Sequence, residues 1–138
     1  MKRFLLDTNI ASYLIKRTFP GLTERVRHMP KGSYAISSIS EAEMRLGAAR
    51  KPTEAKIHPL VAEFLNEIEI EPWDSKCAKI YARLVVELER KGEPLSNFDA
   101  MIAAHALAHD FVLVTHDYAF PRVAELKVED WTKGPHRL

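Results

Sequence analysis

The sequence predicts a single α/β domain with a central, mostly parallel β-sheet flanked by helices. Short apolar runs, which are typical of buried strands, recur along the chain and are separated by longer segments of helical periodicity. Strands that alternate with helices form parallel sheets, because a parallel connection needs a crossover and a helix supplies it. The length of 138 residues suits one domain with a substantial core, and a composition of 46% hydrophobic and 28% charged residues argues against disorder.

Five strands are expected. In chain order they are residues 4–6, 34–37, 68–71, 111–114 and about 126–128. The first run has three apolar residues, too few for a helix, and Asp7 follows it at once, as at the end of a central parallel strand. Residues 68–71 alternate between apolar and acidic side chains, which predicts a half-exposed strand.

Six helices are expected between these strands. In chain order they are about residues 10–17, 22–28, 41–49, 54–66, 75–91 and 97–107. Pro59 lies inside the fourth helix and either splits it or marks its true start. Ser75 is expected to cap the fifth helix and Gly92 to close it, whereas Ser96 or Asn97 caps the sixth.

Charge and cysteine content narrow the classes of function. The net charge of +1 gives no global signature of nucleic-acid binding, although residues 2–31 carry seven Lys or Arg against two acids. Cys77 is the only cysteine, so no internal disulfide can form, and its neighbours favour a small core residue over a nucleophile.

No segment reads as a signal peptide or a membrane span, so we expect a cytoplasmic protein. We expect residues 1–132 to form one domain and residues 133–138 to form a fraying polar tail.

Four acids are expected to meet at one edge of the sheet. Asp7 and Asp117 follow strands, and Glu43 and Asp99 lie near the N-terminal ends of helices. In a parallel sheet the helix that leaves a strand begins at the carboxyl edge, where ligands bind. Each acid also has a purely structural interpretation. Asp7 can cap a helix, Glu43 can complete a capping box with Ser40, Asp99 suits a first helical turn, and Asp117 suits a turn.

Carboxylates crowded together without basic partners raise one another's pKa values, and a divalent cation relieves that repulsion. Ligand sets made only of oxygen suit Mg²⁺ or Mn²⁺ rather than zinc. Such an ion activates water and orients a phosphodiester. The four acids therefore predict a divalent-cation site that could serve phosphodiester chemistry.

The segments that carry these acids resemble those of PIN-domain ribonucleases, specifically the VapC toxins of VapBC toxin–antitoxin pairs. In chain order the similar segments are LLDTNI, ISSISEAEMRLG, GEPLSNFDAMIAAHAL, LVTHDYAF and RVAELKVEDW. They span nearly the whole chain. The sequence departs from the family pattern at Glu125, where the family commonly has Gly, and at His116, where Arg or Asn is frequent.

The resemblance implies a PIN-like fold and an Mg²⁺-dependent endoribonuclease in which Mn²⁺ can substitute. Asp7 and Asp99 would bind the ion most directly, and Glu43 and Asp117 would complete the pocket. The residues implied to orient these acids are Thr8, Asn9 and Thr115. A VapB-type antitoxin would supply a basic residue to the pocket, and the toxin would form a homodimer. The implied substrate is tRNA, with the anticodon loop of initiator tRNA as the leading candidate.

Several other candidates remain open. The i, i+4 pair His105 and His109 matches the spacing of a zinc-binding helix face but has no evident third ligand. Three basic residues are candidates for phosphate contacts, and three aromatic residues are candidates for base stacking or, preferably, core packing. These are Arg45, Arg50 and Lys51, and Trp73, Phe98 and Trp131.

Two kinds of alternative function also remain. A phosphatase of the haloacid-dehalogenase type and a response-regulator receiver both place an acid after the first strand. The phosphatase, however, needs a second Asp where this chain has Asn9, and the receiver needs paired acids that are missing here. The other alternative is a non-enzymatic module whose acids hold a structural cation.

Overall fold

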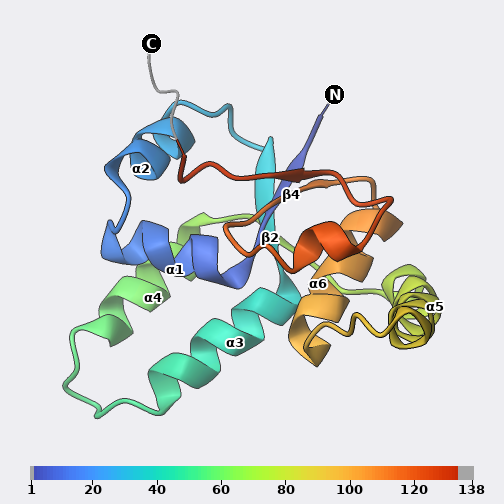
Figure 1. The fold of residues 1–138 in the computed structure, drawn as a ribbon. Coiled ribbons are helices and arrows are strands. Elements are labelled where there is room, and N and C mark those ends of the chain that lie inside the picture. Colours follow the sequence, from blue (N-terminus) through green and yellow to red (C-terminus); the bar gives the residue numbers. More distant parts are fainter. Residues whose placement is uncertain (1, 134–138) are drawn as a thin grey trace.

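A five-stranded sheet in the order β3-β2-β1-β4-β5 organises the protein, and every neighbouring pair of strands is parallel (Figure 1). We analysed a computed structural model, which describes residues 2–133. The strands are β1 Phe4–Leu6, β2 Tyr34–Ser37, β3 Ile70–Glu71, β4 Val112–Val114 and β5 Val128–Glu129. The predicted α/β class and all five strands are confirmed, with β3 and β4 shorter than expected and β5 slightly later. Most of the predicted tail, residues 134–138, lies outside the described residues.

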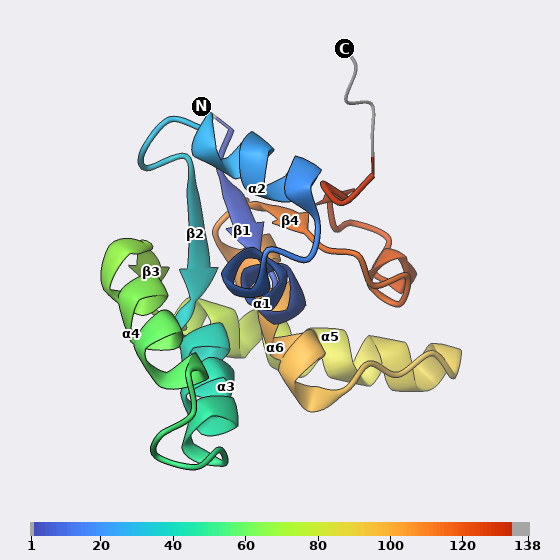
Figure 2. The same ribbon diagram turned by 90° about the vertical axis from the view of Figure 1, so that its left-hand side faces the viewer.

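The two faces of the sheet bury different sets of helices. The helices are α1 Thr8–Lys16, α2 Pro20–Arg27, α3 Ser38–Ala49, α4 Ile57–Glu67, α5 Ser75–Lys91 and α6 Asn97–Ala108. Figures 1 and 2 show α1, α2 and α4 on one side of the sheet and α5 and α6 on the other. A short 3-10 helix, Phe120–Arg122, was not expected from the sequence.

Side chains of the central strands β1 and β4 point alternately to the two faces of the sheet, which explains why each face packs against its own set of helices. In β1, Leu6 packs with α1, α2 and α4, whereas Leu5 faces the α5 and α6 side. In β4, Val114 and Leu113 divide in the same way. Because successive strand side chains point to opposite faces, an uninterrupted apolar strand fills both cores at once.

The caps differ from prediction at two helices. Asp74, rather than Ser75, caps α5, and its Oδ1 accepts a hydrogen bond from the backbone N–H of Cys77 at 3.0 Å. Gly92 ends α5 as expected with a φ of 70°. The alternative interpretation of Ser40 and Glu43 as a capping box is wrong, because α3 starts directly after β2 with Ser37 as its cap. Ser40 therefore lies inside the helix, and Glu43 is free to make other contacts.

The structure also tests the expectations for Pro59, for two aromatic residues and for Cys77. Pro59 is the third residue of α4, a position that needs no intrahelical N–H bond, so it marks the start of that helix. Trp131 is buried against Phe4, with ring centroids 4.9 Å apart, as expected of a core residue. Phe98 is 44% exposed, so its expected core packing is wrong. Cys77 is fully buried, as expected.

Among residues 2–133, no helix is both long enough and apolar enough to span a membrane.

Candidate active site

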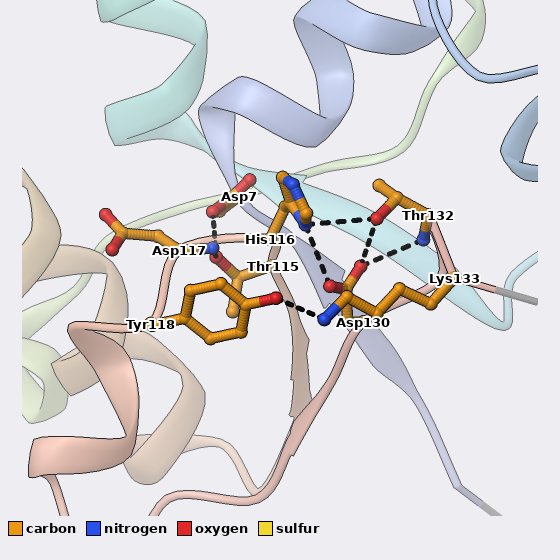
Figure 3. Close-up of polar contacts among 8 residues, drawn as sticks. All are labelled: Asp7, Thr115, His116, Asp117, Tyr118, Asp130, Thr132 and Lys133. Atoms are coloured by element: carbon orange, nitrogen blue, oxygen red, sulfur yellow. Dashed lines mark hydrogen bonds and ion pairs between the residues drawn. The ribbon is translucent and has the colours of Figure 1, made fainter.

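Asp7 lies where the two central strands end. β1 and β4 pair in register at Leu6 and Val114, so the residues that follow them, Asp7 and Thr115, are neighbours. The Thr115 hydroxyl donates a hydrogen bond to Oδ2 of Asp7 at 2.5 Å (Figure 3). The N–H of Ile10 donates to Oδ1 at 2.8 Å. Asp7 is thus both the cap of α1 and a buried, oriented carboxylate at the carboxyl edge of the sheet.

Asp117 is anchored to the same threonine. Its backbone N–H donates to Oγ1 of Thr115 at 2.9 Å, and its own Oδ1 accepts from the N–H of Ala119 at 2.8 Å. Thr115 therefore links the positions of Asp7 and Asp117, as Figure 3 shows. Asp117 is half-buried.

Glu43 reaches the site from α3 and is held by the first residue of α1. The Thr8 hydroxyl donates to Oε1 of Glu43 at 2.5 Å, and it lies 2.8 Å from the hydroxyl of Ser40. Ser40 is fully buried and was not among the expected site residues. Its contact with Thr8 depends on the true start of α3, which the expected capping box had placed three residues too late.

Asp99 lies in the first turn of α6. Ser96 caps this helix by accepting a hydrogen bond from the backbone N–H of Asp99 at 3.2 Å. The Asp99 side chain is half-buried. The helix N-terminus favours a negative charge there, which keeps an acid tolerable in a crowded acidic site.

Three of the four carboxylates have raised pKa values, and the charge of another acid of the group contributes to each rise. Burial above all, with the charges of Asp99 and Asp117 added, raises the pKa of Asp7 to about 6, although its two hydrogen bonds oppose that rise. The pKa of Glu43 is raised by burial and by the charge of Asp99. The pKa of Asp99 is raised by burial and by the charge of Asp117. The raised pKa values therefore reflect electrostatic repulsion within a group of acids that was expected to converge.

Among residues 2–133, no ion pair offsets that repulsion. Within residues 2–133, none of the four acids forms an ion pair. Oxygen donors without a basic partner are a donor set that suits a hard divalent cation. The four acids do not form a closed cage, however. The one group of three or more metal-binding side chains in the described residues with ligand atoms within 4.8 Å of one another lies elsewhere, at Asp74, Cys77 and His109. These acids would have to move inward or bind an ion partly through water.

A cavity of about 230 Å³ opens beside Glu43. Its lining combines Thr8, Asn9 and Glu43 with apolar side chains of α1, α3 and α4 and with two lysines, Lys16 and Lys51. The expected orienting residue Asn9 thus lines this cavity. The cavity meets the acidic group through Glu43, whereas Asp7, Asp99 and Asp117 lie outside its lining.

One further acid at the end of a strand, Asp130, was not predicted from the sequence. Asp130 follows β5 as Asp117 follows β4, and its Oδ2 lies 2.8 Å from Nδ1 of His116. The Thr132 hydroxyl donates to Oδ1 of Asp130 at 2.6 Å, so these three side chains form a network beside Asp117 (Figure 3). The rule that located Asp117 would have located Asp130 too, had it been applied to the short last strand. Tyr118, next in the chain after Asp117, is 67% exposed.

Two of the basic candidates, one aromatic candidate and Glu125 make contacts of their own. Arg45 pairs with Glu41 at 2.8 Å on the surface of α3, and Lys51 lines the cavity beside Glu43. Glu125, at a departure from the family pattern, lies 3.7 Å from Arg83. Trp73 donates its indole N–H to the carbonyl of Met101 at 2.8 Å, which fits a packing role between segments.

Comparisons with known proteins agree with this fold. The sequence profile of the PIN domain matches residues 4–126. A tRNA(fMet)-specific endonuclease VapC from Shigella flexneri is 32% identical over 96% of this chain and 100% of its own length. Ribonuclease VapC2 from Rickettsia felis is 34% identical over 94% of this chain and 98% of its own length. A crystal structure of DNA-bound VapBC from Salmonella typhimurium contains a similar chain, with a TM-score of 0.87 and 32% identity over 95% of this chain and 99% of that chain.

Proposed function

The chain belongs to the PIN-domain family, in its VapC branch, and we propose that it is the toxin of a type II toxin–antitoxin pair, acting as a metal-dependent endoribonuclease. The observation that carries the metal-dependent part is the buried carboxylate of Asp7, whose pKa is raised to about 6 among acids that lack a basic partner. A protein gains nothing in stability from such an arrangement. A cation-binding catalytic site explains it.

The proposed metal ligands are Asp7 and Asp99, with Glu43 and Asp117 completing the site. All the donors are oxygens, so Mg²⁺ fits, and Mn²⁺ would substitute. When bound, the ion would supply an acidified water and positive charge for the departing oxygen. The PIN-domain match over residues 4–126 argues against the phosphatase and receiver alternatives.

The protein's own groups orient the reaction. Thr115 and the N–H of Ile10 fix both oxygens of Asp7, and Thr8 fixes one oxygen of Glu43. In the proposed reaction the oxygen of a water molecule attacks phosphorus and the phosphorus–oxygen bond of the leaving nucleotide breaks. One of the carboxylates takes the proton of the attacking water. Hydrogen bonds to the acids limit their motion and so favour one geometry for the phosphodiester.

The proposed substrate is tRNA, with initiator tRNA as the leading candidate. The Shigella flexneri relative is named as tRNA(fMet)-specific, and it aligns with nearly all of this chain. Proteins recognise RNA loops by stacking aromatic side chains on unpaired bases. Phe98 and Tyr118 are exposed and are the chain neighbours of Asp99 and Asp117. An aromatic residue beside each of two metal-binding acids suits a splayed loop.

Replacing these aromatics is expected to weaken RNA binding. Loss of one base stack costs about 1–3 kcal/mol, so Phe98→Ala and Tyr118→Ala should each raise the Kd roughly 5- to 150-fold. Fluorescence anisotropy with a labelled anticodon stem–loop would measure this, in an Asp99→Asn background that prevents cleavage. Phe98→Tyr and Tyr118→Phe should retain binding, and Val86→Ala, which removes an exposed apolar side chain of α5, should leave it unchanged. Equal Kd values for the Ala and aromatic variants would contradict base stacking.

A VapB-type antitoxin is the proposed partner. The similar structure from Salmonella typhimurium is a VapBC complex on DNA. The unpaired acids offer a place for a basic residue of the antitoxin, and the cavity beside Glu43 adds apolar surface for neighbouring side chains. In such a pair the antitoxin supplies the DNA-binding domain, which agrees with this chain's net charge of +1. We further propose a homodimeric toxin that acts in the cytoplasm, where its tRNA substrate is found.

Cleavage of total tRNA by the purified, antitoxin-free protein tests the proposed function. We expect discrete fragments with Mg²⁺ or Mn²⁺ and none with a chelator, and mapping the fragment ends would identify the cleaved loop. Intact tRNA and ribosomal RNA under every metal condition, from protein shown to be folded, would overturn the nuclease assignment. The acids would then hold a structural cation in a non-enzymatic module.

A further inference from the structure

A second cluster of metal-binding side chains lies where the start of α5 meets the end of α6. We call Asp74, Cys77 and His109 the α5–α6 cluster. One Asp74 oxygen, Oδ1, accepts from the backbone N–H of Cys77 at 3.0 Å, and the other, Oδ2, lies 2.9 Å from Nε2 of His109. A carboxylate oxygen, the thiol sulfur and an imidazole nitrogen all lie within 4.8 Å of one another. In residues 2–133, this is the one group of metal-binding side chains so closely gathered.

The cluster is open to solvent on one side and closed on the other. Cys77 is fully buried, whereas the side chains of Asp74 and His109 are 43% and 34% exposed. An ion can therefore reach the cluster from solvent and meet the thiol at its base. Burial above all raises the pKa of the Cys77 thiol to about 11, so the thiol is neutral until a bound metal displaces its proton.

His105 adds an independent sign that a partner belongs in this corner. In residues 2–133, Nε2 of His105 is the one buried side-chain nitrogen or oxygen atom that has no hydrogen-bond partner. The residue is fully buried, and its ring packs edge-on against the ring of His109 with centroids 5.7 Å apart. A buried polar atom without a partner costs free energy, so its presence needs an explanation.

The hydrogen bond at the other nitrogen of His105 is compatible with a free lone pair on Nε2. Nδ1 of His105 lies 2.9 Å from the Ser37 hydroxyl oxygen, which can accept a hydrogen bond from Nδ1–H. With Nδ1 protonated, Nε2 carries a lone pair that is available to a metal. Ligand histidines are commonly held in this way by a hydrogen bond from their second nitrogen.

We propose that the α5–α6 cluster binds a zinc-class divalent cation through Asp74, Cys77 and His109, with the ring of His105 packed against His109. Sulfur, nitrogen and oxygen together are a zinc-type ligand set, unlike the all-oxygen set of the acidic site. Ligand atoms on one tetrahedral zinc lie about 3.3–3.6 Å apart by the usual bond lengths, so the cluster needs only a small contraction. On binding, the Cys77 thiol would lose its proton to solvent.

This site would act as a clamp rather than as a second catalytic centre. His109, the C-cap of α6, lies ten positions after Asp99, which at 1.5 Å per residue is about 15 Å along the helix axis. The ion would join the first turn of α5 to the end of α6. It would therefore stabilise the packing of the two helices that cover one face of the sheet.

Cobalt binding tests the proposal directly. Cys77 is the only cysteine, so any thiolate-to-cobalt charge-transfer band must come from it. We expect that band at one Co²⁺ per chain in the full-length protein, displaced by Zn²⁺. It should be absent in Cys77→Ser, and strongly weakened in His109→Gln and Asp74→Asn. Asp110→Asn is the matched control because Asp110 follows His109 and its side chain is 89% exposed, and it should leave the band unchanged.

Thermal unfolding supplies a second readout. Stoichiometric Zn²⁺ should raise the Tm of the wild type and of Asp110→Asn more than that of Cys77→Ala, which keeps an apolar group in the buried position. Zinc bound at the acidic site would raise the Tm of all three proteins alike. The absence of a charge-transfer band, or an equal rise in Tm with and without the Cys77 thiol, would overturn the proposal and leave the proposed nuclease function untouched.

Discussion

Replacing Asp99 by asparagine is expected to lower RNA cleavage by about a hundred-fold or more. Loss of a group that merely orients a metal ligand typically costs 10- to 100-fold, and a direct ligand costs at least that. The substitution keeps the size of the side chain and the Ser96 cap of α6, so the fold should persist. It also removes one of the charges that raise the pKa values of Asp7 and Glu43. The metal-free variant should therefore be more stable than the metal-free wild type.

Two measurements distinguish a lost ligand from a damaged fold. Calorimetric titration with Mn²⁺ should show weaker binding by Asp99→Asn, and circular dichroism should show an unchanged helix content. Asp110→Asn, which neutralises an exposed acid beyond the other end of α6, should cleave RNA like the wild type. An Asp99→Asn protein that cleaves at the wild-type rate would remove Asp99 from the proposed metal site.

The acids at the strand ends were predictable because their positions depend on local order and on one rule of topology. Asp7 and Asp117 follow apolar runs that have no alternative structure, and parallel strands bring their carboxyl ends to one edge. The strand order, with β1 between β2 and β4, then brings Asp7 beside Thr115.

Contacts that depend on the start of a helix or on packing between helices were not predictable. The expected capping box at Ser40 hid the contact of Thr8 with Glu43, since α3 begins without a loop after β2. The i, i+4 spacing of His105 and His109 matched a zinc-binding helix face but gave no third ligand. His109 contacts Asp74 on another helix, and that partner follows from how α5 packs on α6.

The pH dependence of folding offers the second large effect. The pKa of Asp7 is raised from 3.8 to about 6 in the folded state, so the folded protein binds this proton more tightly than the unfolded chain. The stability contributed by protonated Asp7 is therefore complete below about pH 4, falls as the pH rises, and is lost above about pH 6. The shift corresponds to a loss of about 3 kcal/mol for this buried group. Denaturant midpoints of the chelated protein from pH 4 to pH 8 would measure the loss.

Variants at two positions separate this effect from other titrations. Asp7→Asn should flatten the pH dependence in chelator and should lose the stabilisation that Mg²⁺ gives the wild type at pH 7. Thr115→Val should steepen it, because the Thr115 hydroxyl is the main group that lowers the pKa of Asp7. A wild-type pH profile in Asp7→Asn would show that other groups cause the dependence. The opposite responses at Asp7 and Thr115 would instead show that the protein holds a buried charge at the sheet edge at the expense of its own stability, as a cation-binding site requires.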